Sequence, residues 1–339
     1  MKGPVVAFDG SVLAAGPPTG VARAFLTTLH AYAAGEVRCV LLLPPDTDVG
    51  DEVPSSVTVV PAPRGSVRKQ LVWPRLLRRL RADLLHVPVA FAPLRLPCPV
   101  VVTVHDLPWR VRPRLPAGDA PRGRHRLALR LVARAAFAHL VPSQATADDL
   151  RAELPHLSAR VRVVPHGVAP APAAAARDLQ GDLVVLGDDR PRKNRARVRA
   201  AHDRARSTAP DLPALRFVGP PDRFVSERDK DALLRRARGL VHLSLHEGFG
   251  LPVLEAMVRG VPVLCSTRGG LAELAEGGAA LTADPLDVDA MAAAMLRLCH
   301  DEDLRAHLRQ LGLRRAAVFT PERSAEGWRR VHAEALAAS

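Results

Sequence analysis

The 339-residue chain lacks the features that mark membrane and secreted proteins. No apolar run approaches the ~18–20 residues that a membrane-spanning helix needs. The longest apolar runs, Cys39–Leu43 and Val100–Val104, have the length of a strand. The N-terminus has no charged start, apolar core and cleavage site of the kind that make a signal peptide. We therefore expect a cytoplasmic protein.

Cysteine is also scarce. Of the four cysteines, none is paired at metal-ligand spacing, and three lie in or beside apolar segments. This pattern is typical of buried thiols in a reducing compartment, with a catalytic cysteine as the minor alternative. The four are Cys39, Cys98, Cys265 and Cys299.

Aromatic residues make up only 4% of a chain whose formal net charge is +13. Strong basic charge raises nucleic acid as a partner, but few aromatics means few stacking platforms for single strands. The basic residues are nearly all arginine in a chain rich in Ala and Pro, which indicates compositional bias. We therefore expect no nucleic-acid partner. The charge is uneven, since residues 1–170 carry +10 and residues 171–339 carry +3.

The length fits two domains. In each half, short β-type runs alternate with helical segments, which predicts a parallel sheet covered by helices on both faces. The Pro- and Ala-rich segment 165–182 interrupts this rhythm as a linker would. We expect an N-terminal domain over 1–168, a C-terminal domain over 169–320, and a helix over 321–339 that packs back toward the N-terminal domain.

The strands expected from these runs lie in both halves of the chain. They are Val5–Phe8, Val37–Leu43, Val57–Val60, Leu84–Val87, Val100–Val104, His139–Val141, Val161–Val164, Leu183–Leu186, Leu215–Val218, Leu240–Leu245, Val261–Ser266 and Ala279–Leu281. Open parallel sheets bind ligands at the carboxyl ends of their strands. Two doubly wound, Rossmann-like domains therefore predict a central cleft in which two substrates meet.

The segment 240–270 carries the most chemical information. We expect a strand, a tight turn over 246–250, a helix over 251–259 with Pro252 in its first turn and Gly260 as its C-cap, and a second strand. Free N–H groups at a helix start bind anions. Because proline has no N–H, Leu251 and Val253 are the expected donors.

Two carboxylates flank this turn. Glu247 stands at the carboxyl end of the strand, and Glu255 lies one turn into the helix. On one helix, eight residues would separate them by ~12 Å, whereas glycosidase carboxylate pairs lie ~5–9.5 Å apart. The spacing favours binding of sugar hydroxyls over hydrolysis.

The run Glu247-Gly-Phe-Gly-Leu-Pro-Val-Leu-Glu255-Ala-Met, followed by Gly260-Val-Pro-Val, resembles the E-x7-E signature of glycosyltransferase family 4, whose fold is GT-B. Weaker matches follow the family's order over most of the chain. They are Gly20-Val-Ala-Arg, Val104-His105-Asp106-Leu107, Val141-Pro-Ser-Gln-Ala-Thr, Val164-Pro-His-Gly-Val, and Leu186-Gly187 with Arg192-Lys193-Asn194.

The resemblance implies roles for the residues of the signature. Glu255 would bind the ribose hydroxyls of a nucleotide, and Glu247 would contact the donor sugar. The backbone from Phe249 through Gly250 to Leu251, with Val253, would hold the sugar and a phosphate. Gly20 would approach the diphosphate, although Pro18-Thr19 stands where the family has a second glycine.

Arg192 and Lys193 would neutralise the leaving diphosphate, a task for which fixed cations are suited. Some family members place an arginine directly after the glycine of this loop, where this chain has Asp188. The resemblance puts His105 and Asp106 on the acceptor side. It implies same-face substitution with no metal or other cofactor, the leaving phosphate accepting the acceptor's proton. We expect His166, His242, His246 and Arg23 to be structural.

The sequence thus predicts a retaining hexosyltransferase that uses a nucleotide-sugar donor of the GDP-mannose or UDP-hexose type. The acceptor stays open between a lipid-linked sugar, a glycan and a small molecule. A pseudo-glycosyltransferase would keep every motif. Three other classes fit less well: another enzyme on this fold, such as a nucleotide-sugar epimerase or a phosphorylase, a nicotinamide oxidoreductase, and a noncatalytic nucleic-acid-binding protein. The oxidoreductase is disfavoured because no G-x-G-x-x-G follows a predicted strand.

The basic N-terminal half contains one amphipathic segment, residues 66–83. Such a face can lie on an anionic membrane, each charge contributing ~1 kcal/mol near the surface. The alternative is an arginine-rich helix that packs its leucines on the sheet, with Pro74 interrupting it. The basic residues of this segment are Arg68, Lys69, Arg75, Arg78, Arg79 and Arg81.

Overall fold

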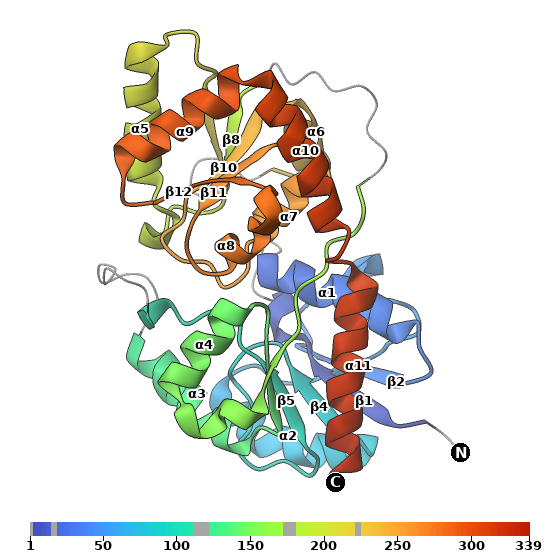
Figure 1. Cartoon of the computed structure of the whole chain (residues 1–339). Coiled ribbons are helices and arrows are strands. Elements are labelled where there is room, and N and C mark those ends of the chain that lie inside the picture. The colour runs from blue at the N-terminus through green and yellow to red at the C-terminus, as the bar shows by residue number, and fades with distance from the viewer. Residues whose placement is uncertain (1–2, 15–18, 111–121, 172–180, 221–224) are drawn as a thin grey trace. The chain divides into compact units, whose positions relative to one another are not determined.

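The computed structural model describes residues 3–14, 19–110, 122–171, 181–220 and 225–339. They form two compact units, each described by itself. The first comprises Met1–Leu107, Pro121–Ala169 and Thr320–Ser339, and the second comprises Pro108–Ala120 and Pro170–Phe319. Both are parallel α/β units, which confirms the predicted fold class (Figure 1).

The first unit has a seven-stranded parallel sheet in the order β3-β2-β1-β4-β5-β6-β7. Its helices and strands are β1 (Val5–Asp9), α1 (Gly20–Ala33), β2 (Arg38–Leu43), β3 (Thr58–Pro61), α2 (Ser66–Leu80), β4 (Leu84–Val87), β5 (Val100–Thr103), α3 (Arg122–Ala135), β6 (Ala138–Val141), α4 (Gln144–Glu153), β7 (Val161–Val163) and α11 (Pro321–Ala337).

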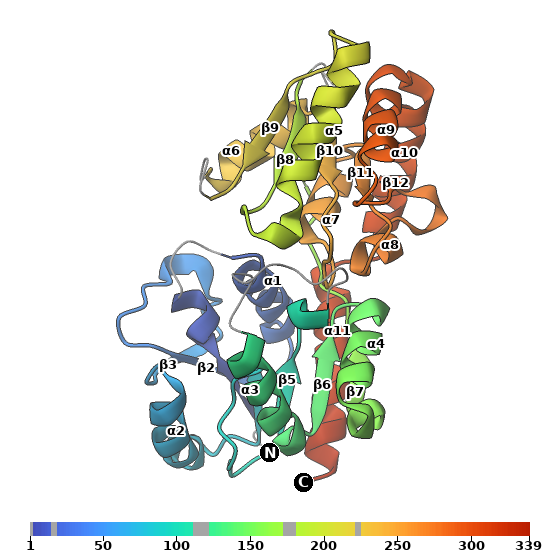
Figure 2. The same cartoon turned by 90° about the vertical axis from the view of Figure 1, so that its left-hand side faces the viewer.

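Helices cover both faces of this sheet because its strands are apolar on both sides. Strand β1 is buried along its whole length. Its Phe8 packs with α1 and α11, whereas the next residue, Asp9, contacts α2. In the view of Figure 2, α2 and α3 lie on the opposite side of the sheet from α11.

The last helix, α11, belongs to the first unit although the whole second unit precedes it in the chain. Trp328 stacks on Phe8 with ring centroids 5.8 Å apart and meets His86 edge-on at 4.3 Å. At the start of α11, Ser324 Oγ donates to the Pro165 carbonyl at 2.6 Å. The helix therefore completes the core of a sheet formed by residues far away in sequence.

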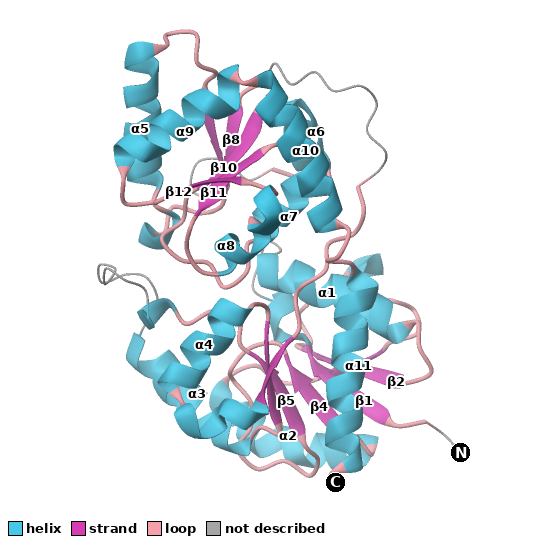
Figure 3. Ribbon diagram, in the orientation of Figure 1, coloured by secondary structure: helices cyan, strands magenta, loops and turns pink. Residues whose placement is uncertain are grey.

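The second unit has a five-stranded parallel sheet in the order β12-β11-β10-β8-β9, and Figure 3 shows helices around it as well. Its elements are β8 (Leu183–Leu186), α5 (Arg195–Thr208), β9 (Leu215–Val218), α6 (Glu227–Arg236), β10 (Gly239–His242), α7 (Leu251–Met257), β11 (Val263–Ser266), α8 (Gly270–Leu274), β12 (Leu281–Ala283), α9 (Val288–His300) and α10 (Glu302–Ala316).

Most expected strands lie within two residues of their predicted bounds. The expected strand 240–245 is shorter, since β10 ends at His242 and the following residues turn toward the site. The expected helix 251–259 ends at Met257, after which Gly260 adopts the left-handed conformation (φ 60°) predicted for it. All four cysteines are free thiols, and burial raises the pKa of Cys265 to about 12.

A buried polar chain links four elements of the first unit. Thr103 Oγ1 lies 3.0 Å from His86 Nε2, His86 Nδ1 lies 3.1 Å from His332 Nε2, and His332 Nδ1 lies 2.9 Å from the Tyr32 hydroxyl. Burial lowers the pKa of His332 to about 3. Burial, helped by the neighbouring His332, also lowers the pKa of His86 well below 6.5. Both rings are therefore neutral in the folded protein.

Lowering the pH from 7.5 to 5.5 should reduce the free energy of unfolding of the first unit. In the unfolded chain, His86 and His332 take up protons below pH ~6.5, whereas in the folded protein they stay neutral. Their contribution to the free energy of unfolding is therefore present above that pH and is lost as the pH falls toward 3. Linkage gives ~1.4 kcal/mol for each histidine at pH 5.5. Urea unfolding at both pH values measures the loss, which His332→Gln should reduce by ~1.4 kcal/mol. An equal loss in that variant would contradict this assignment.

Candidate functional site

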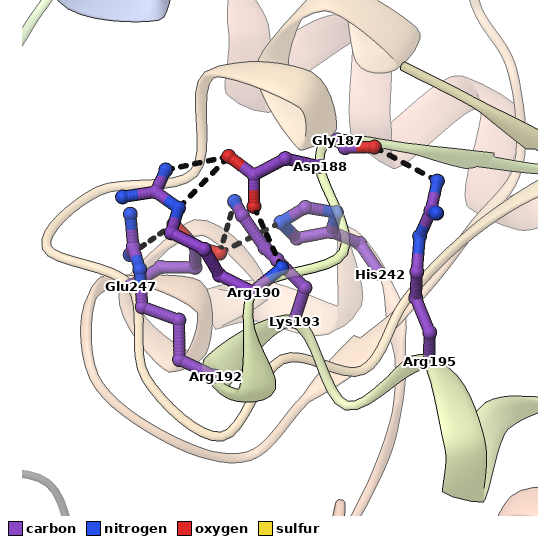
Figure 4. Close-up of polar contacts among 8 residues, drawn as sticks. All are labelled: Gly187, Asp188, Arg190, Arg192, Lys193, Arg195, His242 and Glu247. Atoms are coloured by element: carbon purple, nitrogen blue, oxygen red, sulfur yellow. Dashed lines mark hydrogen bonds and ion pairs between the residues drawn. The ribbon is translucent and has the colours of Figure 1, made fainter. Parts of the chain in front are cut away.

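The site in the second unit begins in the loop after β8. Gly187 has a positive φ of 135°, which favours glycine. Asp188 accepts two bonds from the Arg190 guanidinium, at 2.6 and 2.9 Å. The single turn Pro191–Lys193 follows, and Asn194 (φ 60°) ends it, its side chain donating to the Leu243 carbonyl at 3.1 Å. These bonds fix the loop that carries the predicted cations (Figure 4).

Glu247 is the centre of this loop's contacts. Its Oε1 lies 2.6 Å from Lys193 Nζ, and its Oε2 lies 3.5 Å from an Arg192 nitrogen. His242 Nε2 lies 3.4 Å from Oε1. The Glu247 and Arg192 side chains are only 10% and 9% exposed, so water screens their interaction weakly. Three predicted site residues, Glu247, Arg192 and Lys193, thus lie together.

The carboxyl group of Glu247 is ionised in this arrangement. Burial disfavours the charged form, but Lys193, His242 and Arg192 offset it, so the pKa of Glu247 lies well below its ordinary value. Burial lowers the pKa of His242, which Glu247 only partly opposes, so this ring is neutral. His242, which we expected to be structural, contacts a predicted site residue directly.

The cluster carries an excess of positive charge. Lys193 and Arg192 both contact the single carboxylate of Glu247, so these three side chains carry a net charge of +1 when His242 is neutral. The Arg195 guanidinium lies at the start of the same loop, where it donates to the Gly187 carbonyl at 3.0 Å. Preorganised cations of this kind stabilise an anion without having to reorganise when it forms.

The turn that holds Glu247 packs tightly against the N-terminus of α8. The Gly270 N–H donates to the Glu247 carbonyl at 3.0 Å. A Cβ on Gly269 would lie 2.6 Å from that same oxygen, and a Cβ on Gly250 would lie 2.5 Å from a Leu271 methyl. Glycine is needed at 269 because two backbone segments come into contact there, and at 250 because φ is 114° and the Leu271 side chain occupies the space.

Gly270→Ala should lower the free energy of unfolding by about 1–3 kcal/mol, the usual result of overpacking. The new Cβ would lie 2.6 Å from the Gly248 carbonyl oxygen and 2.7 Å from Phe249 Cα, which are backbone atoms that cannot rotate away. Chemical unfolding measures the effect. Gly123→Ala, on an exposed helix position where a Cβ meets nothing within 4 Å, is the matched control and should not destabilise. Two equally stable variants would contradict this packing argument.

The predicted backbone donors differ from one another. We expected the Val253 N–H to be a free donor, but it donates to the Gly250 carbonyl at 2.9 Å because the chain closes a turn at the start of α7. Val253 is also fully buried. Leu251 is half-buried at the first position of α7. Phe249 is buried and meets Phe319 edge-on at 5.6 Å.

Glu255 has a partner that was not predicted from the sequence. Lys230 Nζ on α6 lies 2.8 Å from Glu255 Oε2 and 2.7 Å from Glu227 Oε2. Lys230 is buried. The rarity of lysine could have drawn attention to Lys230 from the sequence. Among 48 basic residues, the lysines are Lys2, Lys69, Lys193 and Lys230.

The predicted acceptor-side residues lie in the first unit, after β5. His105 Nε2 lies 2.7 Å from the Pro88 carbonyl oxygen, which can only accept, so Nε2 carries the proton. His105 Nδ1 lies 3.1 Å from His166 Nε2. Burial lowers the pKa of His105, with Pro88 and Asp106 opposing it in part, and burial and His105 lower the pKa of His166. In the neutral pair His166 therefore donates to His105, a contact not foreseen for His166.

Two further predictions fall on the first unit. Gly20 is the exposed first residue of α1, whose N-cap Thr19 accepts from the Ala22 N–H at 3.2 Å. Pro18, which precedes them, lies outside the described residues. Within the described parts of the chain, no group of three or more His, Cys, Asp or Glu side chains could hold a metal ion.

Residues 66–80 of the amphipathic segment 66–83 form α2, which runs unbroken through Pro74 and ends before the C-cap Arg81. Lys69 is not part of its basic surface, because its ammonium is buried 2.6 Å from Asp9 Oδ2. Trp73 and Leu77 are buried too. The surface that remains exposed combines apolar and basic side chains, namely Val67, Arg68, Leu71, Val72, Arg75, Arg78, Arg79 and Arg81. Among the described helices, none is both long enough and apolar enough to span a membrane.

Profiles of two protein families match the chain. The family described as "Glycosyltransferase Family 4" matches residues 18–172, and "Glycosyl transferases group 1" matches residues 223–315. The chain is 43% identical over 108 residues to O-antigen chain mannosyltransferase B of Escherichia coli, and 36% identical over 115 residues to alpha-1,3/1,6-mannosyltransferase alg-2 of Neurospora crassa. These matches cover 32% and 34% of the chain and 27% and 23% of the relatives, so the chain spans about a quarter of their length.

Solved structures share the fold over nearly the whole chain. Sucrose-phosphate synthase from Thermosynechococcus elongatus has a TM-score of 0.78 at 19% identity, covering 99% of this chain and 100% of its own. Anabaena HepE in complex with UDP and glucose has a TM-score of 0.71 at 18% identity, covering 97% and 99%. The two family profiles and the pair of parallel-sheet units lead to one assignment: the chain belongs to glycosyltransferase family 4 and has the GT-B fold.

Proposed function

We propose that the protein is a metal-independent, retaining glycosyltransferase that moves a hexosyl unit from a nucleoside-diphosphate sugar to an acceptor hydroxyl. The observation that carries this proposal is the pair of cations, Lys193 and Arg192, that contacts the ionised, buried carboxylate of Glu247. A leaving nucleoside diphosphate gains negative charge as the bond to the sugar breaks, and fixed cations stabilise that charge best. They would do here what a metal ion does in other transferases.

The contacts of Glu247 are compatible with a bound diphosphate. Lys193 has three N–H donors and Arg192 has five, so each can bind a phosphate oxygen while it still holds Glu247. Glu247 is an acceptor only, because it is ionised, and suits hydrogen bonds from sugar hydroxyls. In the proposed step the bond from C1 to the phosphate oxygen breaks, the acceptor oxygen bonds C1 on the same face, and its proton passes to the leaving phosphate.

The names of relatives suggest where to look for the donor. Two curated relatives are named as mannosyltransferases, and HepE was solved with UDP and glucose. We therefore propose a GDP-mannose or UDP-hexose donor, with Glu255 at the ribose hydroxyls and the backbone of Phe249, Gly250 and Leu251 near the sugar. His105 and Asp106 would serve the acceptor.

The acceptor class follows from the surface of α2 if this surface binds lipid. Its exposed Val67, Leu71 and Val72 lie on the same helix as four exposed arginines, and Arg81 follows at the C-cap. We propose that a cytoplasmic protein with this surface docks on the anionic inner face of a membrane, which suits a lipid-linked acceptor. Sedimentation with vesicles rich in anionic lipid tests this proposal independently of catalysis.

Slow hydrolysis of the donor tests the reaction class before any acceptor is known. The protein is incubated with GDP-mannose and with UDP-glucose in EDTA, and proton NMR follows the anomeric signals within minutes, before mutarotation. The proposal expects release of one nucleoside diphosphate together with the α anomer first. Initial appearance of the β anomer, or turnover that requires added metal, would contradict it.

A further inference from the structure

We infer that Lys230 is a positioning residue for nucleotide binding: it holds the Glu255 carboxylate in the orientation that receives the ribose hydroxyls. The inference rests on the proposed function, because it assumes a nucleotide at Glu255. It assigns a role to a residue of α6 that lies outside the signature motif of α7.

The contact is short and sheltered from water. Lys230 Nζ lies 2.8 Å from Glu255 Oε2, and the two side chains are 8% and 16% exposed. The second partner, Glu227, is 62% exposed although its Oε2 lies 2.7 Å away. An exposed ion pair is weakened by solvent, whereas a buried ammonium requires a close partner. Glu255 is therefore the partner that stabilises the buried charge.

The α6 helix also holds the backbone at this position. Arg259 donates to the Glu255 carbonyl at 2.8 Å, and its Nε lies 2.7 Å from Asp231 Oδ1 on α6. Both the main chain and the side chain of Glu255 are thus tied to α6, one through Asp231 and Arg259 and the other through Lys230. Binding groups whose rotamers are locked in this way lose less entropy when a ligand arrives.

The use of lysine in this chain points the same way. Three of its four lysines, Lys69, Lys193 and Lys230, have side chains no more than 11% exposed, and each lies within 2.8 Å of a carboxylate. Lys193 pairs with the first glutamate of the signature and Lys230 with the second. An ammonium is a compact charge that occupies less space than a planar guanidinium. Each carboxylate of the signature therefore has its own buried ammonium.

The pair gives a specific chemical expectation. A carboxylate oxygen has two lone pairs, so Glu255 can accept ribose hydroxyls while Oε2 accepts from Lys230. A carboxylate fixed in this way favours a ribonucleotide over its deoxyribose counterpart, which lacks a hydroxyl to donate. Loss of Lys230 frees the carboxylate to rotate, and the preference for ribose should fall.

The test is calorimetric titration of the full chain with GDP, UDP and the 2′-deoxy form of whichever diphosphate binds. We expect Lys230→Met to weaken binding of the ribonucleotide about tenfold and binding of the deoxynucleotide less than twofold, so that the discrimination ratio falls at least fivefold. Lys230→Gln, which keeps a donor, should show an intermediate ratio and serves if the methionine variant does not fold. Glu227→Gln removes a partner of the same lysine on the exposed side, and its ratio should match the wild type.

The outcomes separate the two claims. A folded Lys230→Met or Lys230→Gln protein that keeps the wild-type ratio would overturn this inference, even if both affinities fall together, because a purely structural lysine would affect both nucleotides equally. Binding of neither diphosphate by the wild-type protein would overturn the proposed function and the inference with it.

Discussion

Lys193→Met should lower the rate of sugar transfer by about 10²–10³-fold, the usual effect of removing one preorganised donor from a developing negative charge. Lys193 is the closest cation to Glu247, at 2.6 Å, and belongs to the set proposed to face the leaving diphosphate. Its loss removes stabilisation that exists mainly in the transition state, so we expect kcat to fall more than the affinity for the nucleotide sugar. Steady-state kinetics of donor hydrolysis measure both.

The same variant should change the pH profile. Lys193 is the main group that offsets the effect of burial on Glu247, so its removal should raise the pKa of that carboxyl group. Activity in the wild type should be insensitive to Glu247 titration near pH 5, whereas residual activity in the variant should decline on the acid side. Arg204→Met, which removes an exposed cation of α5, is the control and should behave as wild type. Unchanged kcat in folded Lys193→Met would remove this lysine from the mechanism.

Trp328→Ala should destabilise the first unit by about 3–5 kcal/mol, the range for loss of a large buried aromatic side chain. Trp328 is 7% exposed and lies between α11 and the sheet, with ring centroids 5.8 Å from Phe8 and 6.0 Å from Phe25. The alanine leaves a cavity that these rings cannot fill without moving. Urea unfolding followed by far-ultraviolet circular dichroism measures the loss.

Arg330→Ala is the matched control, because it lies on the exposed side of the same helix and should change stability by less than ~0.5 kcal/mol. If Trp328→Ala costs less than about 1 kcal/mol, α11 is not an integral part of the core of this unit. That result would also weaken the view that a segment beyond the second unit completes the first.

The sequence predicted the fold class well because both sheets are parallel and buried. Continuous apolar runs such as Val100–Thr103 and Leu183–Leu186 have few alternative structures when helices separate them. Element ends were less accurate. The strand before Glu247 was expected to reach Leu245, but β10 ends at His242 because the Leu245 N–H bonds the Arg192 carbonyl at 2.7 Å instead of a neighbouring strand. That bond is a tertiary contact, which local pattern does not encode.

Site residues that belong to a sequence motif could be predicted, whereas residues that reach the site through tertiary packing could not. Glu247 and Lys193 could be chosen from the sequence, and the structure places them in contact. Lys230 could not be paired with Glu255 from sequence spacing, since 25 residues separate them on different helices. Lys69 was expected on a basic surface from its neighbours in sequence, but the helix turns it inward to Asp9.

Binding of a nucleotide sugar to the second unit tests the central claim most directly. Calorimetry would titrate the wild-type protein, Lys193→Met and Glu255→Gln with GDP-mannose, UDP-glucose and UDP-N-acetylglucosamine in the presence of EDTA. Glutamine is preferred to alanine at position 255 because it keeps an acceptor beside the buried Lys230. We predict micromolar binding of donors with one base by the wild type, and weaker binding by both variants. A folded wild-type protein that binds none of the three donors would contradict the account.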